Sequence, residues 1–395
     1  MSSASEIFLS HVAQTSPYPL QIEVNHAEGT RIFDTSGKSY LDFISGIAVT
    51  NIGHRHPKVV EAIKNQVDQY MHVMAYGEFI QAPQNDLAAK LVSLLPTPLD
   101  CCYFVNSGTE ANEAALKLAK RVTGRTKIVS CKKSYHGSTH GSLSVSGNEV
   151  KKYAFRPLLP DVHFITFNDM ADLAMIDEQT AAVIIEPIQG DAGVRIPADR
   201  YLKALRQRCD ETGAMLIFDE VQTGFGRTGK LFAFEHFDVV PNVLTIAKGM
   251  GGGMPIGAFV ADRAHMQQLT HDPMLGHITT FGGHPVNCAA ALANIEAILE
   301  EQLLDEVETK GALLEELITH PEVIEIRRKG LMFAVEFASA DQVQKIVEQC
   351  IADGLITFWF LSCPESFRLA PPLNVTEEEI REAAQIIQKA IQKRL

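Results

Sequence analysis

Seven short, almost uniformly apolar segments recur between residues 102 and 260, and they constrain the fold of this chain more than any other feature. A strand that is apolar at every position has no face for water, which is typical of a sheet covered by helices on both sides. Helix-like stretches, including 110–121 and 198–212, alternate with these segments. The pattern predicts a doubly wound α/β domain. The predicted strands are 102–105, 127–130, 162–165, 182–185, 215–218, 243–246 and 257–260.

Beyond Pro285 the pattern changes to a long helix-like stretch, two strand-like segments at 322–327 and 331–337, and a closing helix from Thr376 onwards. We interpret this region as a smaller α+β domain, which the first residues of the chain complete through a hairpin at 32–41. A chain of 395 residues exceeds the usual size of one hydrophobic core. The predicted parts are 1–50, joining the small domain, 51–285, the large domain, and 286–395, the C-terminal small domain.

Composition narrows the classes of protein to which the chain can belong. The formal net charge is −13 and no dense Lys/Arg run opposes it, which argues against a nucleic-acid surface. No apolar run reaches the ~20 residues of a membrane span, and no signal-peptide pattern opens the chain, so we expect a cytoplasmic protein without a membrane partner. Seven cysteines without a Cys-x-x-Cys pair predict reduced thiols. His54 and His56 alone specify no metal, and we expect none.

Lys248 is the first candidate catalytic residue. It follows the apolar segment 243–246 and runs directly into Gly249. A lysine that leaves a buried strand beside glycines loses hydration and with it affinity for its proton, so its amine becomes a carbonyl nucleophile. The strand at 215–218 ends at Asp219, and a carboxylate beside a pyridine nitrogen holds that nitrogen protonated. Pyridoxal phosphate (PLP) requires these two groups.

The segment 106–112 offers a site for the phosphate of such a cofactor. It follows one predicted strand and opens a helix, so free backbone amides and the positive end of the helix dipole face an anion. The hydroxyls of Ser107 and Thr109 add contacts. The same residues can also do no more than cap a helix, and this alternative stays open from the segment alone.

A second glycine-rich pattern favours a different ligand, a dinucleotide. Residues 224–229 match the dinucleotide fingerprint G-x-G-x-x-G and follow a strand. However, five residues separate the pattern from that strand, and the residues after it are a poor match to a phosphate-capping helix. Nucleotide binding is therefore the weaker interpretation.

Seven motifs occur in chain order. They are Ser107-Gly-Thr-Glu-Ala-Asn-Glu-Ala-Ala-Leu-Lys117, Tyr135-His-Gly137, Glu186-Pro-Ile-Gln-Gly190, Asp219-Glu-Val-Gln-Thr-Gly-Phe-Gly-Arg227, Ala247-Lys-Gly249, Thr279-Thr-Phe-Gly-Gly283 and Arg368-Leu-Ala-Pro-Pro372. These motifs resemble those of the class III aminotransferases of PLP fold type I, particularly the acetylornithine/ornithine aminotransferase branch. The resemblance extends from about Gly29 to the C-terminus. It implies a mostly parallel seven-stranded sheet flanked by helices in a large domain, with a smaller α+β domain beside it.

The resemblance implies a role for each matching residue. Lys248 would hold PLP as a Schiff base and then shuttle the substrate proton, and Asp219 would pair with the pyridine nitrogen. The other implied cofactor contacts are Tyr135 and Val221 on the two ring faces, Gln222 near the phenolic oxygen, Ser107, Gly108 and Thr109 at the phosphate, Glu186, and Thr280 at the phosphate of a neighbouring subunit. A homodimer with shared active sites follows from the role of Thr280.

Four residues are implied on the substrate side. Arg368 would clamp the α-carboxylate of an amino or 2-oxo acid with two parallel hydrogen bonds. Asp191 stands where ornithine-type relatives carry a glutamate that gates this arginine, and a shorter acid predicts a weaker gate. Thr279 is a further substrate contact. Ser138 replaces an arginine that commonly grips a substrate carboxylate, which removes about 2–5 kcal/mol of recognition.

The resulting prediction is transfer of an amino group from N-acetylornithine or ornithine to 2-oxoglutarate, giving a semialdehyde and glutamate. Ser138 leaves alternatives open. The Tyr-His-Gly-Ser-Thr sequence also resembles class III racemases and epimerases, and another ω-amine is an alternative donor. A PLP-fold protein without catalytic activity is the remote alternative. His136, His140 and Arg156 are the side chains that we consider as substitutes for the missing arginine.

Overall fold

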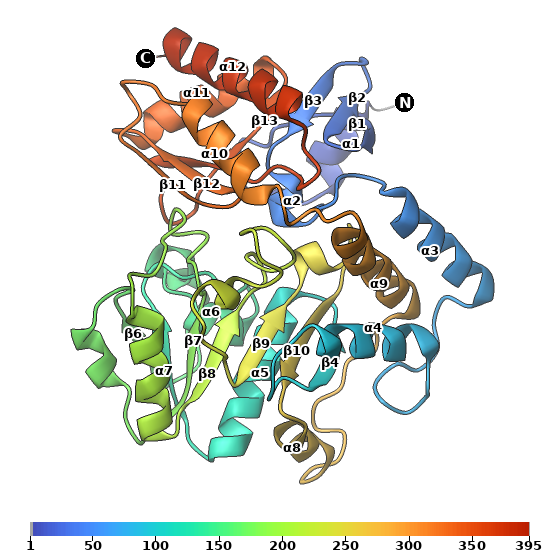
Figure 1. Ribbon diagram of the computed structural model, residues 1–395, viewed down its shortest axis with the longest axis vertical. Helices are drawn as coiled ribbons and strands as arrows, with labels where there is room; N and C mark the ends of the chain where they lie inside the picture. The colour runs from blue at the N-terminus through green and yellow to red at the C-terminus, as the bar shows by residue number, and fades with distance from the viewer. Residues whose placement is uncertain (1–2, 395) are drawn as a thin grey trace.

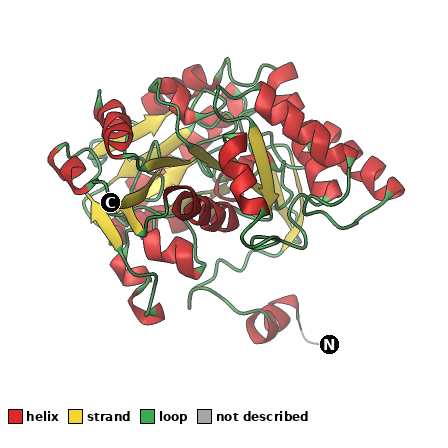
Figure 2. Cartoon of the chain, turned by 90° about the horizontal axis from the view of Figure 1, so that it is seen from below, coloured by secondary structure: helices red, strands yellow, loops and turns green. Residues whose placement is uncertain are grey.

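The computed structural model describes residues 3–394. A large sheet with its helices forms one unit and a smaller α/β unit lies beside it, carrying both ends of the described chain (Figure 1). Seen from below, the strands lie between layers of helices (Figure 2). Within residues 3–394, no helix has the length and apolar character needed to cross a membrane.

The central sheet has seven strands, as predicted. β10 is antiparallel to both of its neighbours, and the other adjacent pairs are parallel. All seven predicted strands are confirmed within one or two residues. In sheet order they are β4 (Cys101–Val105), β10 (Gly257–Ala261), β9 (Val243–Ile246), β8 (Met215–Asp219), β7 (Thr180–Ile185), β5 (Lys127–Cys131) and β6 (Val162–Ile165).

Helices cover both faces of this sheet, which explains its apolar strands. Along β8, Leu216 and Phe218 face one core, whereas Met215 and Ile217 face the other. Helix α5 covers the second face, and α4, α7 and α9 supply the first core. The helices of this unit are α3 (Pro57–Gln69), α4 (Ala82–Ser93), α5 (Gly108–Thr123), α6 (His140–Val145), α7 (Tyr201–Thr212), α8 (Arg263–Met266) and α9 (Pro285–Glu300).

The smaller unit contains two four-stranded sheets, and the predicted hairpin is confirmed by the antiparallel pairing of β2 with β3. Strand β13 pairs with β3, so the two ends of the chain share one sheet. The sheets are β1 (Val24–Glu28), β2 (Arg31–Asp34), β3 (Ser39–Asp42) and β13 (Leu355–Ile356), and β11 (Glu325–Lys329), β12 (Met332–Glu336), β15 (Ser366–Leu369) and β14 (Phe358–Trp359). The remaining helices are α1 (Ala4–His11), α2 (Ser45–Ala48), α10 (Val307–Leu317), α11 (Ala340–Ala352) and α12 (Glu377–Arg394).

Helix α9 lies directly after the predicted domain boundary at 285/286. It packs on α3 and α4, and its residues Ile295 and Ile298 belong to the core of the large sheet. The division of the chain at 50/51 and 285/286 stays a prediction. The packing of α9 places the change of core after residue 300, because Val307 of α10 belongs to the core of the smaller unit.

The G-x-G-x-x-G segment at 224–229 joins the two units. Arg227 is fully buried, and its guanidinium donates to the carbonyls of Leu331 and Pro371 and to Oδ1 of Asn51. Gly226 has a φ of 92°, and a Cβ there would lie 2.5 Å from Cδ1 of Leu373. The glycine pattern is therefore explained by close packing between the units.

Candidate active site

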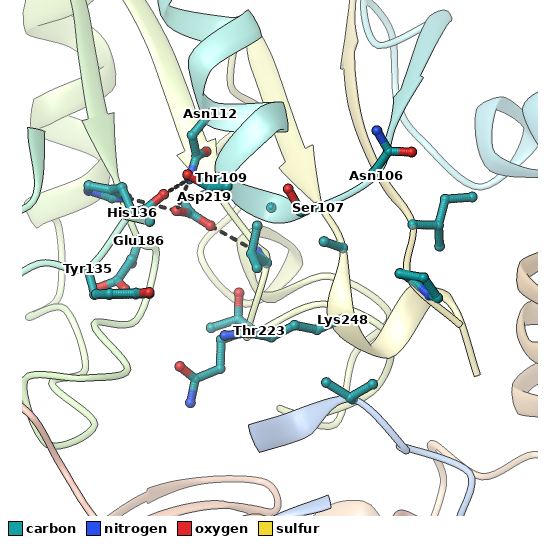
Figure 3. A pocket seen from close by; sticks show the side chains of 18 of the residues that line it. Asn106, Ser107, Thr109, Asn112, Tyr135, His136, Glu186, Asp219, Thr223 and Lys248 are labelled. Carbon is teal, nitrogen blue, oxygen red and sulfur yellow. Dashed lines mark hydrogen bonds and ion pairs between the residues drawn. The ribbon is translucent and has the colours of Figure 1, made fainter. Parts of the chain in front are cut away.

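A cavity of about 480 Å³ lies at the carboxyl ends of β4, β8 and β9 (Figure 3). In parallel sheets this edge is where ligands bind, because strand-to-helix loops converge there. The structure brings ten of the predicted site residues to this cavity. They are Ser107, Gly108, Thr109, Tyr135, Ser138, Glu186, Asp219, Val221, Gln222 and Lys248.

Lys248 begins the short 3₁₀ turn η5 (Lys248–Met250) one residue after β9. Its φ is 43°, a left-handed conformation that aims a non-glycine residue away from the strand direction at a cost of about 1–3 kcal/mol. Burial lowers the pKa of Lys248, and the charge of Arg368 also lowers it, whereas the carboxylate of Asp219 opposes this. Its amine has no hydrogen-bond or ion-pair partner within residues 3–394. These conditions favour an uncharged, nucleophilic amine.

Asp219 is held by three donors. Oδ2 accepts from Nδ2 of Asn112 at 2.8 Å and from Nδ1 of His136 at 2.7 Å, and Oδ1 accepts from the backbone amide of Val221 at 3.0 Å (Figure 3). The amide oxygen of Asn112 in turn accepts from Oγ1 of Thr245 at 2.7 Å. The carboxylate therefore has one orientation, with acceptor capacity left for a proton carried by a ring nitrogen in the cavity.

The N-terminus of α5 supplies an anion-binding site in the wall of the cavity. Ser107 caps the helix, because its hydroxyl accepts from the amide of Glu110 at 3.3 Å. The first amides of a helix have no intrahelical acceptor, and the helix dipole adds positive potential there. Thr109 Oγ1 lies 2.7 Å from Oγ1 of Thr139. A Cβ at Gly108 would lie 2.6 Å from Cγ1 of Val221, so only glycine fits between this turn and the loop after β8.

Tyr135, Val221 and Glu186 form the walls of the cavity around Asp219. Tyr135 is 40% exposed, so one face of its ring is available to a ligand. Burial raises the pKa of Glu186 well above its usual value, and the charges of Asp219 and Asp191 raise it further. Its Oε2 is buried without a hydrogen-bond partner within the described chain. When protonated, this carboxyl can donate a hydrogen bond to a ligand.

Arg368 and Asp191 form a buried ion pair. Nη2 of Arg368 lies 3.0 Å from Oδ1 of Asp191, and both side chains are 8% exposed. Asp191 also accepts from the amide of Leu361 and from the hydroxyl of Ser362. The guanidinium stacks over Phe360 at 4.3 Å. The shorter acid at position 191 therefore does reach the arginine.

The other predicted substrate-side residues, Ser138, Thr279 and Thr280, are not part of this ion pair. Ser138 is exposed, and its hydroxyl lies 3.3 Å from that of Tyr135. Thr279 accepts from Nδ2 of Asn106, which itself lines the cavity, at 3.0 Å. Thr280 is exposed and does not line the cavity, so its predicted role in a neighbouring subunit stays a prediction.

Asn112, which holds Asp219, and Thr245, which holds Asn112, were missed by the sequence interpretation. Asn112 stands inside the quoted Ser-Gly-Thr motif, four positions after Gly108, where one turn of helix returns a side chain to the same face. Thr245 had no such signal, because it reads as an ordinary strand residue. His136 was considered as a substitute for the missing arginine, whereas the structure directs it to Asp219. Arg156 pairs with Glu149 and does not line the cavity.

Comparison with known proteins decides the family, because residues 12–391 match the aminotransferase class-III family. The chain belongs to the class-III aminotransferases. The acetylornithine aminotransferases of Methanopyrus kandleri and Bacillus subtilis are each 39% identical to it, over 94% of this chain and 94% and 95% of theirs. The ornithine aminotransferase of Toxoplasma gondii, solved with partial occupancy of PLP at its active site, has a TM-score of 0.91 and 29% identity over 99% of this chain and 93% of that one.

Class-III aminotransferases are PLP-dependent, and the cavity of this aminotransferase fits the cofactor. The amine of Lys248, without a partner in residues 3–394, and the fixed carboxylate of Asp219 line the same cavity, and the free amides of α5 offer a place for a phosphate. The predicted family, fold type and cofactor are confirmed. The individual contacts of the predicted residues with PLP stay predictions.

Proposed function

We propose that this class-III aminotransferase transfers an amino group from N-acetylornithine or ornithine to 2-oxoglutarate, giving a semialdehyde and glutamate. The observation that carries the proposal is the ion pair between Arg368 and Asp191. With the arginine covered, a donor enters with its terminal amine. With Asp191 displaced, the same arginine grips the α-carboxylate of glutamate or 2-oxoglutarate. The acetylornithine aminotransferases among the relatives support this substrate class.

Bound PLP supplies a protonated ring that withdraws electrons from the carbon next to the substrate nitrogen. The residues of the chain prepare this chemistry. Asp219, held by Asn112 and His136, would keep the ring nitrogen protonated. Tyr135 and Val221, which line the cavity, would confine the ring between them. Lys248, whose amine is favoured in its uncharged form, would accept the proton from the substrate carbon at Nζ and deliver it to the carbon on the other side of the substrate nitrogen.

The site is equipped for one substrate carboxylate but not for a second. Arg368 is buried and positioned for one carboxylate, whereas the uncharged hydroxyl of Ser138 offers no ionic contact to a second. An amino acid that donates its terminal amine carries its carboxylate far from the reacting nitrogen. Glutamate, which reacts at its α-amine, carries its side-chain carboxylate there. A second cation near the cavity is therefore part of the proposal.

We further propose a homodimer with shared active sites, in the cytoplasm. Large apolar side chains are exposed at Phe281 (54%), which follows Thr280 in the chain, and at Ile80 (93%), in the segment after His72. His72 and Phe281 are 5.0 Å apart, so the two segments form one surface. Helix α1 has no buried residue and extends away from the body of the molecule (Figure 2). A second copy would cover these surfaces and bring Thr280 to its phosphate site.

The test is a donor screen of the PLP-loaded enzyme with 2-oxoglutarate, in which glutamate formation is measured. We expect N-acetylornithine or ornithine to be the best donor among these two, lysine, putrescine, γ-aminobutyrate and alanine. Glutamate formation only from donors without a distant carboxylate would contradict the proposed substrate class. Loss of α-deuterium from a labelled amino acid without glutamate formation would instead support the racemase alternative.

A further inference from the structure

A second cavity of about 310 Å³ adjoins the first. Tyr135 and Ser138 line both cavities, so the two spaces meet at these side chains. Asp191 also lines the second cavity, so this cavity reaches the ion pair between Asp191 and Arg368. A substrate that reacts at Lys248 can therefore extend past Tyr135 into this space.

The second cavity is bounded by a connected set of hydrogen bonds rather than by independent loops. Nδ2 of Asn148 donates to Oγ of Ser362 at 2.9 Å, and this hydroxyl donates to Oδ2 of Asp191 at 3.0 Å. Asp191 accepts from Arg368 through its other oxygen. The turn at residues 148–151 is thus tied to the same loop that holds the partner of Arg368.

Lys151 supplies the cationic side chain of this cavity. It ends the 3₁₀ turn η1 (Glu149–Lys151), is exposed, and its ammonium has no hydrogen-bond or ion-pair partner within residues 3–394. The adjacent Lys152 differs, because it is buried and donates to the carbonyl of Ser146 at 2.8 Å. Burial of Lys152 anchors the turn and leaves the side chain of Lys151 available to the cavity.

The charge balance of the cavity favours an anionic ligand. Its one carboxylate, Asp191, is already paired with Arg368. His140 also lines the cavity and adds positive charge only when protonated. A carboxylate that enters here meets an unpaired ammonium and no unpaired acid.

We propose that Lys151 binds the substrate carboxylate that lies far from the reacting nitrogen. The inference rests on the proposed function and defines its substrates as amino acids and 2-oxo acids that carry a carboxylate far from the reacting carbon. Lys151 then supplies the ionic contact that Ser138 does not.

The first test measures binding without chemistry. Glutarate, which has two carboxylates, and propionate, which has one, are titrated into the PLP-loaded wild-type enzyme and the Lys151→Gln variant by calorimetry. We expect the variant to bind glutarate about 10- to 100-fold more weakly, as for loss of a charged hydrogen bond, and propionate within about twofold of wild type. Lys345→Gln, on the exposed surface of α11, is the matched control and should change neither.

The second test restores the charge. The double variant Ser138→Arg/Lys151→Gln should regain most of the glutarate affinity, because Ser138 lines both cavities and the substitution returns a cation to them. Equal weakening of glutarate and propionate, or unchanged glutarate binding in Lys151→Gln, would overturn the inference. If wild type makes glutamate from its donors in that case, the proposed function stands without it. No glutamate from any donor would instead mean that the proposed function has failed.

Discussion

Lys248 combines a lowered pKa with a strained backbone, and neither property serves folding. Burial without a partner costs stability, as does a positive φ at a residue with a side chain. Asp219 shows the opposite arrangement, with every hydrogen bond directed at keeping its carboxylate in place. Lys248 is therefore the group that must react and move, and Asp219 is the group that must stay in place.

The substitution Lys248→Ala should lower glutamate formation at least about 10³-fold, because it removes both the nucleophile and the proton carrier. The measurement is glutamate production with the best donor, together with mass spectrometry after borohydride reduction, which reports covalent retention of the cofactor. Wild type should retain it and the variant should not. Near-normal turnover in the variant would contradict the assigned role.

His236 provides a pH-dependent contribution to stability outside the site. Burial lowers its pKa from 6.5 to about 4, and Lys329 also lowers it. The folded chain keeps the ring neutral, whereas the unfolded chain takes up a proton near pH 6.5, so stability is lost as the pH falls from about 6.5 towards 4.

Between pH 7.5 and 5, we expect wild type to lose about 1–2 kcal/mol more of its free energy of unfolding than His236→Gln. Glutamine retains a donor for the carbonyl of Thr228, to which His236 Nε2 donates at 3.0 Å. Urea unfolding at the two pH values measures the difference. An equal loss in both proteins would show that the ring titrates normally in the folded state.

At the scale of elements, the site depends on how α5 meets the strand ends. The helix begins at Gly108, where Ser107 caps it, and ends before Gly124, which adopts a φ of 67°. These capping signals are local and visible in the sequence. The close approach of Gly108 to Val221 is not local, since more than a hundred residues separate them.

Gly108→Ala should weaken PLP binding about tenfold or more, because the added Cβ must displace the methyl groups of Val221 from the cavity wall or move the amides of α5. Equilibrium dialysis of the cofactor measures the effect. Adding Val221→Ala removes the two clashing methyl groups, so the double variant should bind PLP better than Gly108→Ala alone. A double variant that is no better would place the cause elsewhere.

At the scale of the whole molecule, the cavity depends on two units held in register. Arg368 and Asp191 come from different units, and their pairing requires that β15 and the loop after β7 meet. Arg227 also holds the two units together, because its guanidinium donates to acceptors on Asn51, Leu331 and Pro371. Desolvation lowers the pKa of Arg227 to about 9, so its acceptors compensate for burial of the charge.

Arg227→Met should lower the free energy of unfolding by about 3 kcal/mol or more, because three buried acceptors lose their donor at once. Thermal or urea unfolding of the PLP-loaded enzyme measures the loss. Arg381→Met, at an exposed position on α12, is the control and should change stability by about 0.5 kcal/mol at most. Equal effects of the two substitutions would remove the joining role of Arg227.

Much of this architecture follows from the sequence alone. Uniformly apolar strands determine a sheet covered on both faces, because burial of each strand is a property of its own residues. Lys248, Asp219 and Arg368 were identified by residue type and position in motifs. What could not be predicted are contacts between side chains far apart in the chain, such as Asn112 and His136 converging on Asp219.

Tertiary structure decided how closely charges far apart in the chain meet. The resemblance predicted that the acid at 191 gates the arginine at 368, but the 3.0 Å contact between them depends on how the two units are packed. Lys151 and Lys152 are identical letters side by side, yet one is exposed at a cavity and the other is buried over Phe164. The reason is physical. Hydrophobic patterns act through each segment's own burial, whereas the position of a charge depends on every element that surrounds it.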